Sequence, residues 1–145
     1  MFRDQFVLEA YGLALLVTVL MLRHVARGWS NAPARIPLYI GTDGRPGFLV
    51  PRLWLWVAPG IVAVLVVVLG CAVALSPAPD DARPVPLALV FVLLAEVAGF
   101  VGWLSGLQVE LGRGMTFRIA PIRLWRAVAA ILVTVAATIY VAANP

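Results

Sequence analysis

The chain has 145 residues, of which 63% are hydrophobic and 12% are charged, and its eleven arginines exceed seven acidic residues to give a net charge of +4. An ordinary soluble domain carries about 25% charged residues, so the composition excludes that class. The single cysteine excludes an intramolecular disulfide framework and a thiolate metal cluster within one chain. The length is that of one domain.

Four apolar segments are long enough to cross a membrane. A helix spanning the hydrocarbon core of about 30 Å needs about 20 apolar residues. Segments at about 6–25, 53–75, 86–107 and 124–142 meet this requirement and lack the alternation of barrel strands. We therefore predict an all-α integral membrane protein, a single four-helix transmembrane domain with loops at about 26–52 and 108–123. The alternative for the first segment is a signal peptide, but Arg23, His24 and Arg27 follow it without a small-residue cleavage site.

The arginines predict the orientation of the helices. Nine of the eleven lie in or beside the two loops at 26–52 and 108–123. Positive charge in short loops marks the cytoplasmic side, so we expect a multi-pass protein of the bacterial inner membrane with both termini extracytoplasmic. Tryptophans gather at the same segment ends, as in a belt beside anionic headgroups. The expected lipid-headgroup residues are Arg113, Arg118, Arg123, Arg126, Trp54, Trp56 and Trp125.

The stretch 113–126 alternates basic with apolar residues, which is typical of a segment lying in the membrane interface. Residues 115–119 have a second interpretation, as a short strand that pairs with residues 36–40 in a small cytoplasmic cap.

The first loop is far longer than the usual connection of about 4–6 residues, so we expect it to be structured. Residues 36–40 are mainly apolar and aromatic and predict a short extended piece. Pro37 favours an edge position because proline cannot donate a backbone hydrogen bond. Asp43 and Gly44 predict a turn, since glycine accepts positive φ and aspartate can bond its own backbone.

The spacing of residues in this loop resembles that of a known family. The pattern is Ile-Pro-x-(His/Tyr)-(aromatic or aliphatic)-x-x-x-Gly-x-Pro, with a basic residue opening the next helix, and it resembles the first loop of SdpI-like bacterial membrane proteins. The resemblance covers about a quarter of the chain and implies a membrane-embedded binding or immunity protein. The candidate interaction residues that it marks, with their turn neighbours, are Tyr39, Asp43, Gly44, Arg45, Pro46 and Arg52.

Glu96 is the one ionisable residue near the centre of a predicted span. A carboxylate there costs about 2.5–3.5 kcal/mol, so it is expected to face other helices and to have a partner. Thr18 and Thr134 are the nearest neutral candidates in depth. Two interpretations remain: a neutral acid hydrogen-bonded to a hydroxyl, a carbonyl or a second subunit, or a group that binds protons, ions or a ligand.

Small residues recur at four-residue spacing beside Glu96. Ala98, Gly102 and Gly106 lie on one side of the third segment, a pattern that lets helices approach closely. The row serves either packing within the chain or dimerisation.

Catalytic and cofactor motifs are missing from the sequence. It contains no Walker loop, no G-x-G-x-x-G, no HExxH and no strand-to-helix G-x-S-x-G, and nothing favours nucleic acid binding. His24 as a pigment or haem ligand is the alternative to an interfacial residue. We expect no enzyme, cofactor or metal, but a protein that binds another membrane protein or itself within an anionic bilayer. A small proton- or ion-coupled transporter using Glu96 is the alternative. An enzyme acting on lipid is not favoured, because the sequence shows no paired catalytic acid and base.

Overall fold

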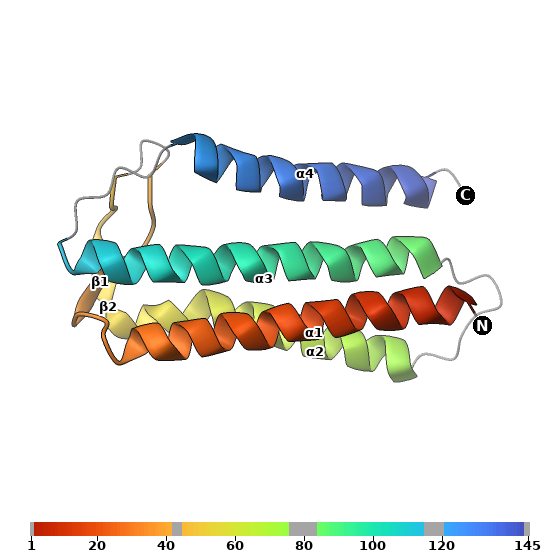
Figure 1. Ribbon diagram of the computed structural model, residues 1–145, viewed down its shortest axis with the longest axis horizontal. Helices are drawn as coiled ribbons and strands as arrows, with labels where there is room; N and C mark the ends of the chain where they lie inside the picture. Colours follow the sequence, from red (N-terminus) through yellow and green to blue (C-terminus); the bar gives the residue numbers. More distant parts are fainter. Residues whose placement is uncertain (1, 42–44, 76–83, 115–120, 144–145) are drawn as a thin grey trace.

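The computed structural model describes residues 2–41, 45–75, 84–114 and 121–143, which form four long helices and a short hairpin (Figure 1). The helices are α1 (Phe2–Trp29), α2 (Val57–Leu75), α3 (Pro84–Gly112) and α4 (Pro121–Ala143). The 3-10 turn η1 (Arg52–Trp56) leads into α2. Four helices are long and apolar enough to cross a membrane, which confirms the predicted all-α bundle with four candidate spans.

The helices α1 and α3 each continue by about one turn beyond the segments expected at about 6–25 and 86–107. The helix α1 reaches Trp29 and α3 reaches Gly112, so the first parts of the loops expected at 26–52 and 108–123 are helical. The extra turn of α3 contains Val109, which is buried in one cluster with Val25 and with Ile36 of the hairpin. The helix α3 ends where Gly114 adopts a φ of 78°, a left-handed conformation common just past a helix C-terminus. At the other end of that loop, α4 already begins at residue 121.

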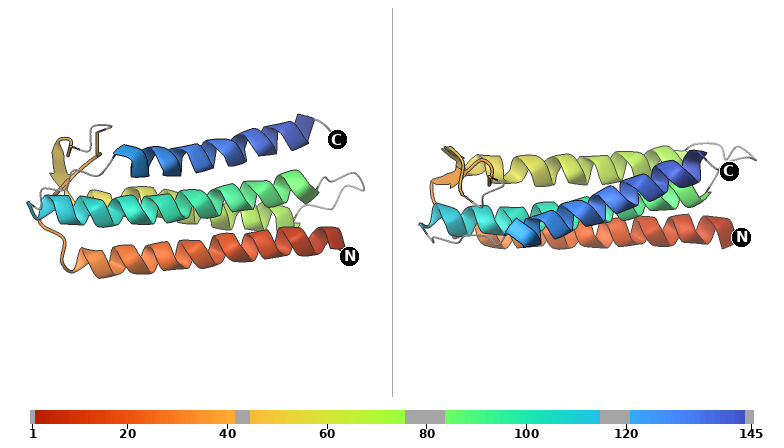
Figure 2. Two further views of the ribbon diagram at one scale, coloured as in Figure 1. Left: turned by 45° about the horizontal axis from the view of Figure 1, so that its top comes forward. Right: turned by 90° about the horizontal axis from the view of Figure 1, so that it is seen from above.

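The helices α1 and α3 run side by side and share the most extensive contact in the bundle (Figures 1 and 2). The helix α2 packs against both of them, whereas α4 packs chiefly against α3. Figure 2 shows α4 crossing α3 obliquely, on the outside of the other three helices. Both termini lie at the same end of the bundle, opposite the hairpin.

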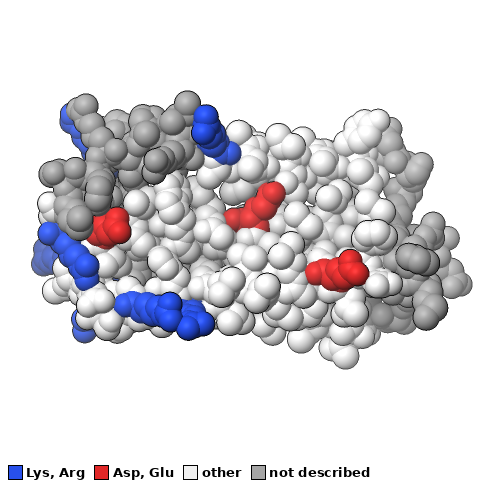
Figure 3. All heavy atoms as spheres, in the orientation of Figure 1, with Lys and Arg blue, Asp and Glu red and all other residues white. Residues whose placement is uncertain are grey.

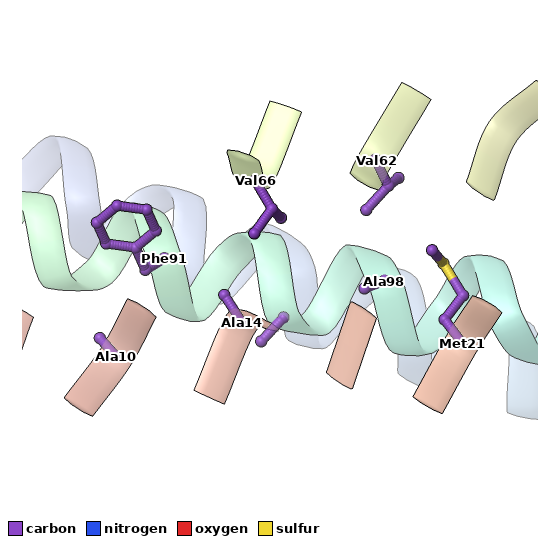
Figure 4. Close-up of a cluster of buried hydrophobic side chains, with 8 residues drawn as sticks. Ala10, Ala14, Met21, Val62, Val66, Phe91 and Ala98 are labelled. Carbon is purple, nitrogen blue, oxygen red and sulfur yellow. The ribbon is translucent and has the colours of Figure 1, made fainter. Parts of the chain in front are cut away.

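The core lies among α1, α2 and α3 and is built from small side chains (Figure 4). Ala14 and Ala98 are fully buried where α1 meets α3, and Val66 fills the space from α2. Lipid tails are as apolar as these side chains, so close van der Waals packing, and not the hydrophobic effect, holds such helices together. Phe91 is the largest buried side chain, and its ring lies 5.1 Å from that of Tyr11.

The loop after α1 folds into an antiparallel hairpin, β1 (Arg35–Pro37) with β2 (Leu49–Pro51). A further bridge joins Ile40 to Pro46, so the extended piece expected at 36–40 is present and pairs within its own loop. Ile36 and Val50 face each other and are buried with Val25, Leu55 and Val109 in a second apolar cluster. The alternative partner strand, 115–119, lies outside the described residues.

Candidate functional site

Glu96 lies midway along α3 and contacts α4. The Thr134 hydroxyl donates to Oε1 of Glu96 at 3.0 Å and is also 3.3 Å from the carbonyl oxygen of Ala130. Of the two threonines expected at this depth, Thr134 is therefore the partner. Thr18 is buried elsewhere and donates to the carbonyl oxygen of Ala14 at 2.7 Å, within its own helix.

The second carboxyl oxygen of Glu96 has no hydrogen-bond partner among the described residues, although it is buried. An ionised oxygen there would require a donor, and a protonated one would require an acceptor. Leaving a buried polar atom unsatisfied costs about 1–3 kcal/mol in either state. The contact between α3 and α4 thus presents one unsatisfied polar group at mid-depth.

The charges of the molecule are distributed so that this carboxyl stands apart. Figure 3 shows an acidic group midway along the visible face, while the arginines of that face gather at the hairpin end. Of the acidic side chains that the structure describes, Glu9 lies near the start of α1 and Glu110 near the end of α3, which leaves Glu96 in the middle. A bilayer-spanning orientation would place it far from both headgroup regions.

The helix α4 is only lightly attached to the rest of the bundle. None of its described side chains is fully buried, and its outer face exposes Leu132, Val133, Ile139 and Tyr140. The Thr138 hydroxyl donates to the carbonyl oxygen of Thr134 at 2.7 Å, within the helix. The hydrogen bond from Thr134 to Glu96 is therefore a specific polar link between α4 and α3.

The row of small residues on α3 faces α1. Ala98 is fully buried, and a side chain at Gly102 would meet Met21 at 3.3 Å. The imidazole of His24 lies over Gly106, with Nε2 only 2.8 Å from where a Cβ would stand. The row packs helices within one chain. The described residues contain no cluster of three or more metal-binding side chains.

The loop residues of the family pattern stabilise the hairpin. The Tyr39 ring covers Gly47, where a Cβ would approach Cζ to 2.6 Å, and meets Phe48 edge-on at 5.7 Å. The Arg52 guanidinium lies 4.8 Å from the centre of the Trp29 ring, a cation–π contact. Arg45 and Pro46 are exposed beside the turn, and Asp43 and Gly44 lie outside the described residues.

The residues expected among lipid headgroups occupy different environments. Trp54, Trp125 and Arg126 are exposed, as membrane anchors would be. Trp56 is partly buried and packs against Trp29 with ring centres 6.2 Å apart. The Arg113 guanidinium donates to the carbonyl oxygen of Asn31 at 2.8 and 3.0 Å, which ties the end of α3 to the loop after α1. Arg118 and the side chain of Arg123 are not among the described parts of the chain.

Gln108 makes a structural contact that was not predicted from the sequence. Its side-chain amide donates to the carbonyl oxygens of Pro37 and Leu38, both at 3.0 Å, and so fixes β1 to α3. The available signal was a lone amide between Leu107 and Val109, at the end of an apolar run.

Comparison of the chain with protein-family models, with curated proteins and with solved structures gave no match. The resemblance to SdpI-like proteins therefore stays a prediction from the first loop. The inference of function depends on the geometry around Glu96 and on the two ends of the bundle.

Proposed function

We propose that this chain is a non-catalytic integral membrane protein that binds a partner within the bilayer. It acts either as an accessory subunit of a membrane complex or as an SdpI-like binding or immunity protein. The observation that carries the proposal is the second oxygen of Glu96, which is buried without a hydrogen-bond partner in the described part of the chain. A hydrogen-bond donor or acceptor on a second membrane protein, or on a second copy of this chain, would satisfy this oxygen.

The position of α4 supports this proposal. Hydrocarbon offers no hydrogen bonds, so a polar atom at mid-depth is stabilised only by protein groups or by a bound ligand. The helix α4 meets the bundle chiefly along α3, and none of its described side chains is buried. Because the free oxygen is buried, a partner helix would reach it by shifting α4, which leaves the core formed by α1, α2 and α3 in place.

A small proton- or ion-coupled transporter is the second candidate, and the same oxygen favours it. A carboxyl with one hydrogen-bonded and one unsatisfied oxygen can exchange a proton. A proton relay needs further ionisable groups along the span. The other acidic and histidine side chains that the structure describes, Glu9, His24 and Glu110, lie toward the ends of α1 and α3. The binding function requires no such relay.

Two substitutions at Glu96 separate the candidates. Gln preserves the shape and hydrogen-bonding capacity of the neutral acid but cannot exchange a proton, whereas Leu removes hydrogen bonding altogether. For a binding protein, Glu96→Gln should keep the mass of the complex purified in gentle detergent, and Glu96→Leu should weaken it by about 0.6–2 kcal/mol, the range for intramembrane hydrogen bonds. Light scattering after size exclusion measures this mass.

Matched threonine variants control for damage to α4. Thr134→Val removes the bond to Glu96, while Thr138→Val removes only a bond within the helix. The binding function predicts that Thr134→Val weakens association more than Thr138→Val. Loss of proton uptake into liposomes in Glu96→Gln, with assembly intact, would establish the transporter instead.

We also propose that the hairpin end is cytoplasmic and that the membrane is the bacterial inner membrane. Nine of the eleven arginines lie in or beside the stretches 26–52 and 108–123, which connect the spans at the hairpin end. In a Cys71→Ala background, a reagent that does not cross membranes should label a cysteine at Asp80 from outside intact cells and leave one at Thr42 unlabelled. The reverse labelling pattern would invert the orientation.

A further inference from the structure

A groove of about 500 Å³ runs between α1 and α3 along the outside of the bundle. Three glycines of α3, Gly99, Gly102 and Gly106, are part of its lining. The lining also includes Val17 and Trp103, and His24 and Glu110 lie nearer to the hairpin end of the two helices. The helix α4 and Glu96 do not line it, so the groove is separate from the site proposed above.

The groove has the dimensions of an elongated apolar ligand. From Gly99 to Glu110 the helix α3 advances roughly 16 Å, about half of the hydrocarbon thickness of a bilayer. The groove therefore extends from mid-membrane to the level of the headgroups at the hairpin end. A chain lying in it would be apolar along its length and polar at one end.

The hairpin end of the groove is lined by Glu110 of α3 and His24 of α1, whereas Arg27 is not part of the lining. Glu110 on α3 is exposed and has no ion pair within the described ranges. His24 lies across from it on α1, with its imidazole against Gly106. Arg27 follows His24 by three residues and so lies on the same side of α1, also exposed. An acceptor for an ammonium group thus stands beside donors for a phosphate.

We propose that this groove binds a phospholipid whose headgroup carries a primary amine. One acyl chain lies along Val17 and Gly99, the ammonium group donates to Glu110, and the phosphate accepts from His24 and Arg27. The carboxylate of Glu110 disfavours a headgroup whose net charge is negative and rewards one that can donate hydrogen bonds from an ammonium group.

A zwitterionic lipid fits the groove because its ammonium and phosphate groups complement Glu110 and His24 at the headgroup level, while its acyl chain suits the apolar remainder. A second copy of the chain is the other possible occupant, since a two-fold axis along the membrane normal would set α3 of one copy against α1 of the other. The oligomeric state measured below distinguishes the two.

Native mass spectrometry of the full chain, delipidated in detergent, tests the proposal. The probes are phosphatidylethanolamine, phosphatidylcholine and phosphatidylglycerol with identical acyl chains. Both headgroups carry a positive charge, but only the ethanolamine ammonium donates hydrogen bonds. The bound fraction of the ethanolamine lipid should therefore exceed that of the choline lipid by about twofold to tenfold, the range for one hydrogen bond of about 0.5–1.5 kcal/mol. Glu110→Leu should abolish this preference and still bind lipid, because the acceptor is lost while the groove remains.

A second pair of variants tests the groove itself. Gly99→Leu adds a side chain to the lining of the groove, and the nearest atom to its Cβ would be Val17 Cγ1 at 3.9 Å, an ordinary contact. Gly12→Leu is the matched control on α1, where a Cβ would meet nothing within 4 Å. Lipid binding should fall several-fold in Gly99→Leu and stay at the wild-type level in Gly12→Leu.

Three outcomes would overturn the proposal. Equal binding of the ethanolamine and choline lipids would exclude recognition of the amine. Unchanged lipid binding in Gly99→Leu would exclude the groove as the site. A shift from dimer to monomer in Gly99→Leu, with lipid adducts unaffected, would show that a second copy occupies it.

Discussion

The Gln108 amide holds the hairpin against α3, so Gln108→Leu is expected to loosen the hairpin while leaving the four helices in place. Its nitrogen donates to the carbonyl oxygens of Pro37 and Leu38 at 3.0 Å. Each hydrogen bond contributes about 0.5–1.5 kcal/mol net, so the two together contribute about 1–3 kcal/mol. Local opening of the hairpin should then become about 5-fold to 150-fold more frequent.

Amide hydrogen exchange measures this opening directly. The amide of Leu38 donates to Phe48 at 2.9 Å and that of Gly47 donates to Tyr39 at 2.8 Å, so both report on the hairpin. Their exchange should accelerate in Gln108→Leu, whereas amides within the spanning helices should keep their rates.

A variant on the exposed surface provides the control. Gln5 donates to Glu9 at 3.3 Å one turn along α1, a contact worth about 0.2–0.5 kcal/mol. Gln5→Leu should leave hairpin exchange unchanged. If Gln108→Leu also left Leu38 and Gly47 as protected as in the wild type, Gln108 would not hold the hairpin.

Two further predictions concern glycines. In α2, Gly70→Ala should destabilise the protein by about 1–3 kcal/mol because its Cβ would enter the Tyr11 ring, whereas Gly60→Ala, with nothing within 4 Å, should stabilise it by up to about 1 kcal/mol; unfolding in detergent compares them. In the hairpin, Gly47→Ala should cost about 1–3 kcal/mol because its Cβ would meet the Tyr39 ring at 2.6 Å, and Tyr39→Ala in the same chain should recover most of the loss in a double-mutant cycle. Equal effects of the two α2 variants, or additive effects in the hairpin, would contradict these contacts.

The four helices could be predicted from the sequence because a bilayer requires about 20 apolar residues, and even the shortest span, with 19 residues, comes close to this length. The ends of α1 and α3 could not be predicted, because the hydropathy of the sequence falls before each of these helices ends. The turns around Val25 and Val109 are held by contacts with Ile36, which is distant in sequence. Similarly, Val50 pairs with Ile36 in a register that the hydropathy of the two short strands does not specify.

The candidate site could be predicted in part. The mid-span position of Glu96 and the depth of Thr134 are countable along the helices, and the structure joins these two residues. The outlying position of α4 was not predictable, because its apolar composition resembles that of the buried helices and lipid accepts the same side chains as a protein core. The sequence likewise did not show which helix the small residues of α3 face. In the structure Gly102 lies against Met21 and Gly106 against His24, so they face α1.

Site-specific photocrosslinking in native membranes tests most directly whether Glu96 lies at a partner interface. A photoreactive residue at Phe100, one turn past Glu96 on α3, should form a discrete crosslinked protein species that persists in Glu96→Gln and is lost in Glu96→Leu. The same group at Leu16, which is 57% exposed on α1, should form no such species. Crosslinks from Phe100 that were identical with and without Glu96 would contradict a binding function for this carboxyl.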